Sequence, residues 1–289
     1  MSEPTSKAGW SRASVQRRLE TIVDDNRFTI AVVFPTVGAI TLVASAEGWL
    51  PEPIAFNSVL ILFGITLMRS PLLVGLAPLV GLWALALLSI LAIYTWAIEV
   101  VGVRTDWPYG AFEYGVELGP MLFDEVPLAL PLFFVPLVLN AYLLTMLVLE
   151  DRTESPLVRI PVAIVAVVAI DLVLDPAAVA VGFWSFDAGG GFYEVPVSNY
   201  LGWVLSGTVA VLLVEVAFDR RQLFDRIETC PFVLDDLVSF VLLWGVINLW
   251  YANWIPAAIA VGFGVTLLAT GRYRHPFDVG RPVVDRLRD

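Results

Sequence analysis

Long apolar runs, separated by short polar connections, fill most of the 289-residue chain. A helix that spans a bilayer needs about 20 mostly apolar residues. Runs near or above this length cover residues 28–50, 54–68, 72–103, 126–149, 157–182, 197–218, 232–250 and 254–270. The second run is short for a span and the third is long, so the pattern is weakest at their boundary. The chain is predicted to be an all-α, polytopic integral membrane protein with about eight transmembrane helices.

The basic residues predict how these helices are oriented. When eight spans start from an inner N-terminus, every lysine and arginine except Arg104 falls in an inner segment, as the positive-inside rule requires. Seven spans would place one basic loop outside and fit less well. The N- and C-termini are therefore expected to be cytoplasmic in a multi-pass protein of the cell membrane. The predicted parts are a polar N-terminal segment (1–27), a single transmembrane domain (28–271) and a C-terminal tail (272–289).

Composition argues against several functional classes. Hydrophobic residues make up 58% of the chain and its mean hydropathy is +0.80, which excludes an ordinary soluble protein. No basic face lies outside the membrane-proximal arginines, so no nucleic-acid partner is expected. One cysteine, Cys230, excludes an intramolecular disulfide, and the single histidine, His275, lies in the tail, so neither histidine catalysis nor a metal site is expected. A net charge of −11 with a single lysine is typical of proteins from salt-loving archaea.

Two carboxylates inside the fifth apolar run form the main candidate site. Asp171 and Asp175 are four residues apart, so on a helix they share one face. Ionisable side chains at membrane depth are costly and usually mark a functional site. Two acids this close cannot both stay ionised, so one is expected to act as a general acid and the other as a general base. Pro176 predicts a kink or break directly after them, although a helix that ends at Asp175, or a polar contact between helices, would also explain the pair.

The two long outer connections, residues 104–125 and 183–196, combine aromatic and acidic side chains with glycines. An aromatic belt at the membrane interface would explain the aromatic residues. It would not explain glycines such as Gly110, Gly115 and Gly189. Irregular backbone at this depth is tolerated where it lines a cavity, so we expect these connections to shape a cavity.

Three further acids and one amide are also candidate site residues, and each has an alternative explanation that needs no functional role. Glu113 and Glu117 would share a face if their segment were helical, whereas in an open loop they would be solvated. Glu99 lies in the outer part of the third run, where snorkelling to the interface is the alternative. Asn140 lies in the middle of the fourth run, where a hydrogen bond between helices is the alternative.

Three other acids have explanations that need no functional role. Asp235 and Asp236 open the seventh predicted helix, where negative charge at a helix N-terminus is favourable. Glu215 is interpreted as an ordinary charge of the inner surface.

Three polar blocks together resemble the CruF-type carotenoid hydratases. They are RTDWPYGAFEYGVELGP (104–120), EVPLALPLFFVPLVLNAYLL (125–144) and DLVLDPAAVAVGFWSF with GFYEVPVSNYLGW (171–203). The resemblance covers about residues 90–205 and implies an integral-membrane hydro-lyase that needs no cofactor. Such an enzyme adds water to the terminal C=C bonds of an acyclic carotenoid held in the lipid bilayer. Within the family, the salt-loving character points to the members that act on a C50 substrate and complete bacterioruberin, a tetra-hydroxylated pigment.

The roles of individual residues follow from their own chemistry. Acid-catalysed hydration needs a proton donor, a base for water and cation-stabilising surroundings. Asp171, which lies deeper, is expected to be the protonated acid, and Asp175 to activate water. The predicted catalytic residues are Asp171, Asp175, Glu113, Glu117 and Glu99. The predicted substrate-binding residues are Trp107, Tyr109, Tyr114, Asn140, Trp184, Tyr193, Asn199 and Trp203.

These acids lie at mid-membrane or further out, so the site is expected to open toward the outer leaflet. Association with other membrane enzymes of carotenoid biosynthesis is a further expectation. Two other functions also use buried carboxylates. An intramembrane prenyltransferase binds Mg²⁺ through a D-x-x-x-D motif, but this chain has no second acidic motif, and its outer side offers only Arg104 to bind the diphosphate. A proton-coupled transporter would suit the acids equally well, but paired broken helices in two matching halves are absent.

Overall fold

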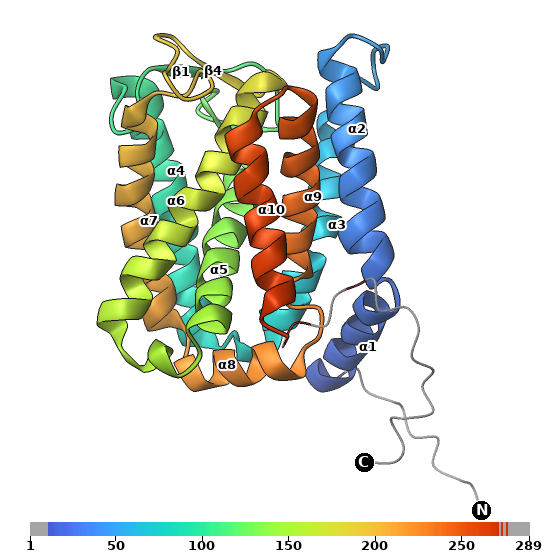
Figure 1. Ribbon diagram of the computed structural model, residues 1–289, viewed down its shortest axis with the longest axis vertical. Helices are drawn as coiled ribbons and strands as arrows, with labels where there is room; N and C mark the ends of the chain where they lie inside the picture. The colour runs from blue at the N-terminus through green and yellow to red at the C-terminus, as the bar shows by residue number, and fades with distance from the viewer. Residues whose placement is uncertain (1–10, 272, 274–275, 277–289) are drawn as a thin grey trace, which may run out of the picture.

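The computed structural model describes residues 11–271, 273 and 276. His275 and almost all of the predicted C-terminal tail therefore lie outside the described residues. The described chain is a bundle of α-helices with a few short strands at one end (Figure 1). Its helices are α1 (Arg12–Asp25), α2 (Phe34–Ala46), α3 (Ser58–Leu76), α4 (Leu82–Thr105), α5 (Leu130–Leu149), α6 (Pro156–Ala180), α7 (Val197–Ala217), α8 (Arg220–Thr229), α9 (Asp235–Trp250) and α10 (Trp254–Ala269).

The predicted all-α class is confirmed. Six helical segments among the described residues are long and apolar enough to cross a membrane. The first of them joins a π-helical turn, Thr29–Val33, to α2, and the others are α3 to α7 with their short extensions. The two last apolar runs form α9 and α10, which have 16 residues each and are shorter than a usual span.

The predicted boundary between the second and third runs is wrong. Helix α3 continues through Pro71 to Leu76, and the chain turns only after a 3₁₀ segment, Ala77–Leu79. A proline inside a helix leaves the carbonyl four residues earlier without its donor. Here the Ser70 hydroxyl donates to that carbonyl, of Leu67, at 2.6 Å, which lets the helix continue. Arg69 therefore lies within a helix that is long and apolar enough to cross a membrane, and not in the loop between two runs.

The predicted break at Pro176 is also absent, because α6 continues for another turn to Ala180. Side-chain amides from neighbouring helices bind carbonyls in this turn. Asn248 donates to the Val173 carbonyl at 2.8 Å, and Asn253 donates to the Pro176 carbonyl at 3.2 Å. In an apolar environment such partners stabilise a helix around a proline.

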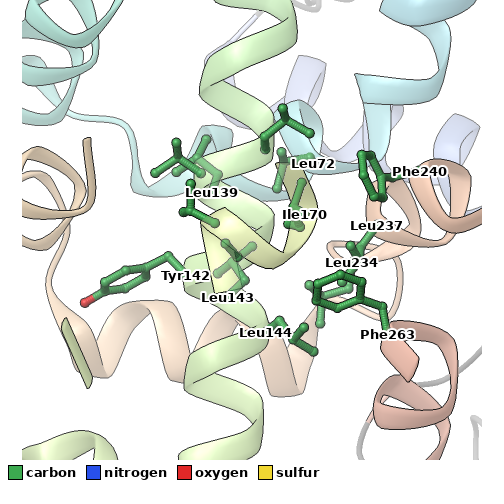
Figure 2. Close-up of a cluster of buried hydrophobic side chains, with 14 of the residues drawn as sticks. Leu72, Leu139, Tyr142, Leu143, Leu144, Ile170, Leu234, Leu237, Phe240 and Phe263 are labelled. Atoms are coloured by element: carbon green, nitrogen blue, oxygen red, sulfur yellow. The ribbon is translucent and has the colours of Figure 1, made fainter. Parts of the chain in front are cut away.

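Helix α5 is the central column of the bundle. Every residue from Pro136 to Leu147 is buried, and α5 packs against α3, α4, α6 and α7. Figure 2 shows Leu139, Leu143 and Leu144 of α5 among buried side chains from other helices, which include Ile170 of α6 and Phe240 of α9. Helices in a membrane associate largely through such close apolar packing. The site described below is built around the N-terminal half of this helix.

The two ends of the bundle differ. Helices α1 and α8 lie at one end, and strands β1 (Phe112–Tyr114) and β4 (Trp184–Phe186) lie at the opposite end (Figure 1). The strands pair antiparallel, with Phe112 opposite Phe186, while β2 (Met121–Leu122) pairs with β3 (Val126–Pro127). The two outer connections predicted to shape a cavity thus meet and form a cap, residues 106–129 and 182–196, over the helix ends.

Candidate functional site

A cavity of about 110 Å³ lies between the cap and the helices beneath it. Aromatic and aliphatic side chains make up most of its wall. Its polar lining residues are Arg69, Thr95, Glu99, Tyr109, Tyr114, Asp175 and Asn199. Cavities of this kind, apolar with a few converging polar groups, are typical of small-molecule sites.

The acid pair is joined by one amide at the wall of this cavity. Asp171 and Asp175 of α6 are both buried, and the Asn199 side chain of α7 donates to a carboxylate oxygen of each, at 3.3 Å to Asp171. Asp175 lines the cavity, whereas Asp171 lies behind it. The other oxygen of Asp171 is buried without a hydrogen-bond partner. Asp175 is therefore the member of the pair that can reach a ligand in the cavity, whereas Asp171 has the deeper position that the sequence predicted.

Glu99 of α4 supplies a further carboxylate to the same cavity. The Tyr114 hydroxyl, from the cap, donates a hydrogen bond to it. Burial and the nearby Glu99 carboxylate raise the pKa of the Tyr114 hydroxyl well above its usual range, so this phenol remains a neutral donor. The two acids on the cavity wall thus have different partners, an amide for Asp175 and a phenol for Glu99.

Aromatic rings surround the acids. Trp203 of α7 stacks on Phe134 of α5, with ring centroids 5.2 Å apart and planes 15° apart. Trp244 of α9 meets the edge of Phe183 at 6.1 Å, and Trp184 of β4 also lines the cavity. Aromatic faces stabilise a desolvated cation by about 2 kcal/mol or more. Phe134 and Trp244 could not be recognised as cavity residues from the sequence, because an aromatic residue in an apolar run looks the same whether it faces lipid or a cavity.

Tyr109 is fixed by close packing at the edge of the cavity. Its ring lies between Gly102 of α4 and Gly202 of α7, and a Cβ at Gly202 would lie only 2.5 Å from the ring. Its hydroxyl is 2.7 Å from the Ser206 hydroxyl, which also binds Tyr94 at 3.1 Å. The two glycines therefore let a cap residue insert between two helices.

The structure leaves several predicted residues out of the cavity. Glu113 lies on β1 and Glu117 in the following loop, so the helical face that would have joined them does not exist, and both are exposed. Trp107 is 57% exposed, which fits the alternative of an interfacial aromatic residue. Tyr193 does not line the cavity, and its hydroxyl accepts a hydrogen bond from the Ile255 amide at 3.2 Å.

Asn140 belongs to a polar cluster deeper in the bundle. It is fully buried and donates to Asp236 at 2.7 Å, while Arg69 binds the other oxygen of Asp236 at 2.7 Å. The neighbouring Asp235 forms two hydrogen bonds with Arg27, at 2.8 and 2.9 Å. A favourable charge at the helix N-terminus is thus an incomplete explanation for the two aspartates, because both are buried ion-pair partners.

Glu215 also differs from the prediction. It binds the buried Arg159 and accepts a hydrogen bond from Tyr142, so it is part of an internal contact between helices and not an ordinary surface charge.

Comparisons with known proteins identify the family of this chain. Residues 56–267 match the model of a family described as carotenoid biosynthesis protein. Bisanhydrobacterioruberin hydratase of Haloarcula japonica is 55% identical over 270 residues, which cover 92% of each chain. No solved structure matches the chain. Because the family model covers most of the chain and the relative covers nearly all of it, this protein belongs to the carotenoid biosynthesis protein family.

Proposed function

We propose that this protein is a carotenoid hydratase, a hydro-lyase that adds water to the terminal C=C bonds of bisanhydrobacterioruberin and so forms bacterioruberin. The main support for this proposal is the carboxyl pair that Asn199 joins at the wall of an aromatic cavity. This combination offers an acid, a base and rings in one apolar space. The similarity to the Haloarcula japonica hydratase supports the choice of substrate.

Hydration begins when Asp175 donates its proton to the less substituted carbon of the alkene. The new C–H bond uses the electron pair of the π bond and leaves a tertiary cation on the neighbouring carbon. Trp203, Phe134 and Trp184 place aromatic faces around this position. A preorganised environment that stabilises developing charge is usually the largest contribution to catalysis.

Water then captures the cation. Its oxygen forms the C–O bond and its released proton goes to Glu99, which Tyr114 holds at the cavity wall. The proton returns to Asp175 through water, so one alkene and one water give one tertiary alcohol and both acids are restored. Asp171 has no surface in the cavity; because two such close acids cannot both be ionised, the pair retains one proton, and Asp175 is the member that can pass it to the substrate.

The direct test is to express the gene in cells that accumulate bisanhydrobacterioruberin and to separate the pigments by chromatography. We expect bacterioruberin with the wild-type chain and only the precursor with Asp175→Asn. Unchanged pigment together with a new proton flux across the membrane would instead identify a proton-coupled transporter.

The same proposal includes a topology for residues 28–271. In it, α9 and α10 cross the membrane together with the six longer segments, and both termini are cytoplasmic. The position of α9 and α10 in the same bundle supports this topology, since α9 packs on α2, α3 and α6, and α10 packs on α6 and α9. Short helices of this kind are accommodated by local thinning of the bilayer.

Thiol labelling in intact cells tests this topology. The native Cys230 is a suitable silent background, because it is buried and burial raises the pKa of its thiol to about 11. Asp187 is exposed on the cap, so a membrane-impermeant maleimide added outside should label Asp187→Cys but not the wild-type chain. If this variant is labelled only after the cells are opened, the cap faces the cytoplasm and the proposed orientation is wrong.

A further inference from the structure

A second polar group lies at the inner end of the cavity. Arg69 of α3 lines the cavity and is 8% exposed, and Asp236 holds its Nη1 at 2.7 Å. The same carboxylate accepts the Asn140 amide on its other oxygen, also at 2.7 Å. One carboxylate therefore fixes an arginine and an asparagine beside each other. Neither Arg69 nor Asp236 has a part in the hydration steps above.

Two atoms of this cluster have no partner. Arg69 Nε and Asn140 Oδ1 are both buried without a hydrogen bond. The guanidinium nitrogen is a donor only, and the amide oxygen is an acceptor only. Buried polar atoms in proteins are nearly always satisfied, so an open pair usually indicates a missing partner. Arg69 lies in a segment that is apolar enough to span the membrane, where a charged residue usually marks a functional site.

A hydroxyl group fits this open pair, because it accepts one hydrogen bond through its oxygen and donates one through its hydrogen. A hydrocarbon chain fits it poorly, because it would cover both atoms without satisfying either one. The positive charge of Arg69 also disfavours a carbocation at this end. The reacting alkene therefore belongs at the outer end, beside Asp175 and Glu99, and the hydroxyl at the inner end.

We propose that Arg69 and Asn140 form a subsite for a hydroxyl group that the carotenoid already carries before it is hydrated. This inference rests on the proposed function and names the class of substrate more narrowly. Bacterioruberin has four hydroxyls and the enzyme adds two, so its substrate brings two of its own. The subsite makes the enzyme selective for hydroxylated acyclic carotenoids over hydrocarbon ones.

Along α5 the cavity lining runs from Leu130 to Leu137, a rise of about 10 Å. Asn140 lies about one turn beyond Leu137, on the side away from the cap. The open pair and the acids beneath the cap therefore lie toward different ends of the cavity.

Arg69→Lys is the sharpest variant, because lysine keeps a positive charge for Asp236 but lacks the Nε–H group. Arg27→Lys is the matched control, since Arg27 forms the neighbouring ion pair with Asp235 and does not line the cavity. Binding is measured on the purified full-length proteins through quenching of tryptophan fluorescence. The two probes are bisanhydrobacterioruberin and lycopene, an acyclic carotenoid without hydroxyls.

We expect the wild-type protein and Arg27→Lys to bind bisanhydrobacterioruberin about 10-fold or more tightly than lycopene. Arg69→Lys should lose that preference while its affinity for lycopene stays unchanged. Asn140→Ala leaves the Arg69–Asp236 pair in place and should lose part of the preference for bisanhydrobacterioruberin. It serves as the second variant if Arg69→Lys does not fold. Equal wild-type affinity for both carotenoids would mean that the open pair holds only water and would overturn the proposal, as would equal weakening of both ligands in the variants.

Because the readout is binding, it separates this inference from the catalytic proposal. If Asp175→Asn still converts the substrate but the binding preference follows Arg69, the catalytic roles are wrong and the subsite stands. If Asp175→Asn is inactive but Arg69→Lys keeps the preference, the subsite is wrong and the catalytic roles stand.

Discussion

Tyr114 in the cap donates a hydrogen bond to Glu99 on helix α4, and both residues line the cavity. The contact joins the irregular cap to the helical bundle. It also fixes the orientation of the carboxylate that we assign as the base for water. A cap residue thus takes part in the site through a helix residue that it holds in place.

Tyr114→Phe should lower turnover while the affinity for carotenoid changes little. Loss of a hydrogen bond to a charged group costs about 1.5–3 kcal/mol, which corresponds to a fall in kcat of about 10-fold or more. Tyr193→Phe is the control, because its hydroxyl binds the Ile255 amide outside the cavity. The measurement is the hydration rate of each purified variant. Equal kcat values for Tyr114→Phe and wild type would exclude Glu99 as the oriented base.

The two aspartates should differ in how strongly they affect the reaction. Asp175→Asn removes the proton donor at the cavity wall and is expected to lower kcat by about 1,000-fold, within the usual range for general acids. Asp171→Asn keeps that donor and changes only its surroundings, so a loss of about 10-fold is expected. The exposed Asp187→Asn should behave as wild type. A larger loss for Asp171→Asn than for Asp175→Asn would return the acid role to Asp171.

Gly202→Ala should destabilise the cap. Its new methyl group would lie 2.5 Å from the Tyr109 ring, so the ring or helix α7 must move. Overpacking of this kind costs about 1–3 kcal/mol, and thermal unfolding in detergent should show a lower Tm together with reduced activity. Gly64→Ala on α3 is the control, because its new methyl group would have no neighbouring atom within 4 Å and alanine favours a helix. An unchanged Tm for Gly202→Ala would show that Tyr109 is not held as described.

The site residues that could be predicted from the sequence are those that are energetically costly to place in an apolar segment. Asp171 and Asp175 stand out because charge is rare inside an apolar run, and the structure places both beside Asn199. The cap was also predicted in outline, because glycines among aromatic residues have no purpose in a simple loop. The pairing of β1 with β4 was not predictable from either connection alone, since three-residue strands have too little pattern to be recognised.

The errors also have physical causes. Pro176, which was expected to kink or break its helix, lies inside α6, because Asn248 and Asn253 bind carbonyls near it, and these partners come from distant parts of the chain. The misplaced boundary then hid Arg69, which looked like an ordinary inner-loop charge. Its partner Asp236 is 167 residues away in the chain, so no local pattern could have paired the two.

The position of the site near one end of the bundle has a consequence for a substrate with two reactive ends. The cavity lies directly beneath the cap, with Asp175 and Glu99 in its wall. A C50 carotenoid is long enough to span the bilayer, so its two ends lie at opposite membrane faces. One site can then reach only one end at a time. Hydration of the second end requires that the half-finished product leaves the cavity, reverses its orientation and binds again.

A time course at limiting enzyme should therefore show a mono-hydrated carotenoid first. This species should rise early, pass through a maximum and fall as the doubly hydrated product accumulates. Excess substrate added midway should delay conversion of the mono-hydrated carotenoid, because the added substrate competes for the cavity during rebinding. A mono-hydrated carotenoid that stays bound would be insensitive to this competitor. Appearance of only the doubly hydrated pigment from the earliest time points, at every enzyme concentration, would show that both ends are processed without release.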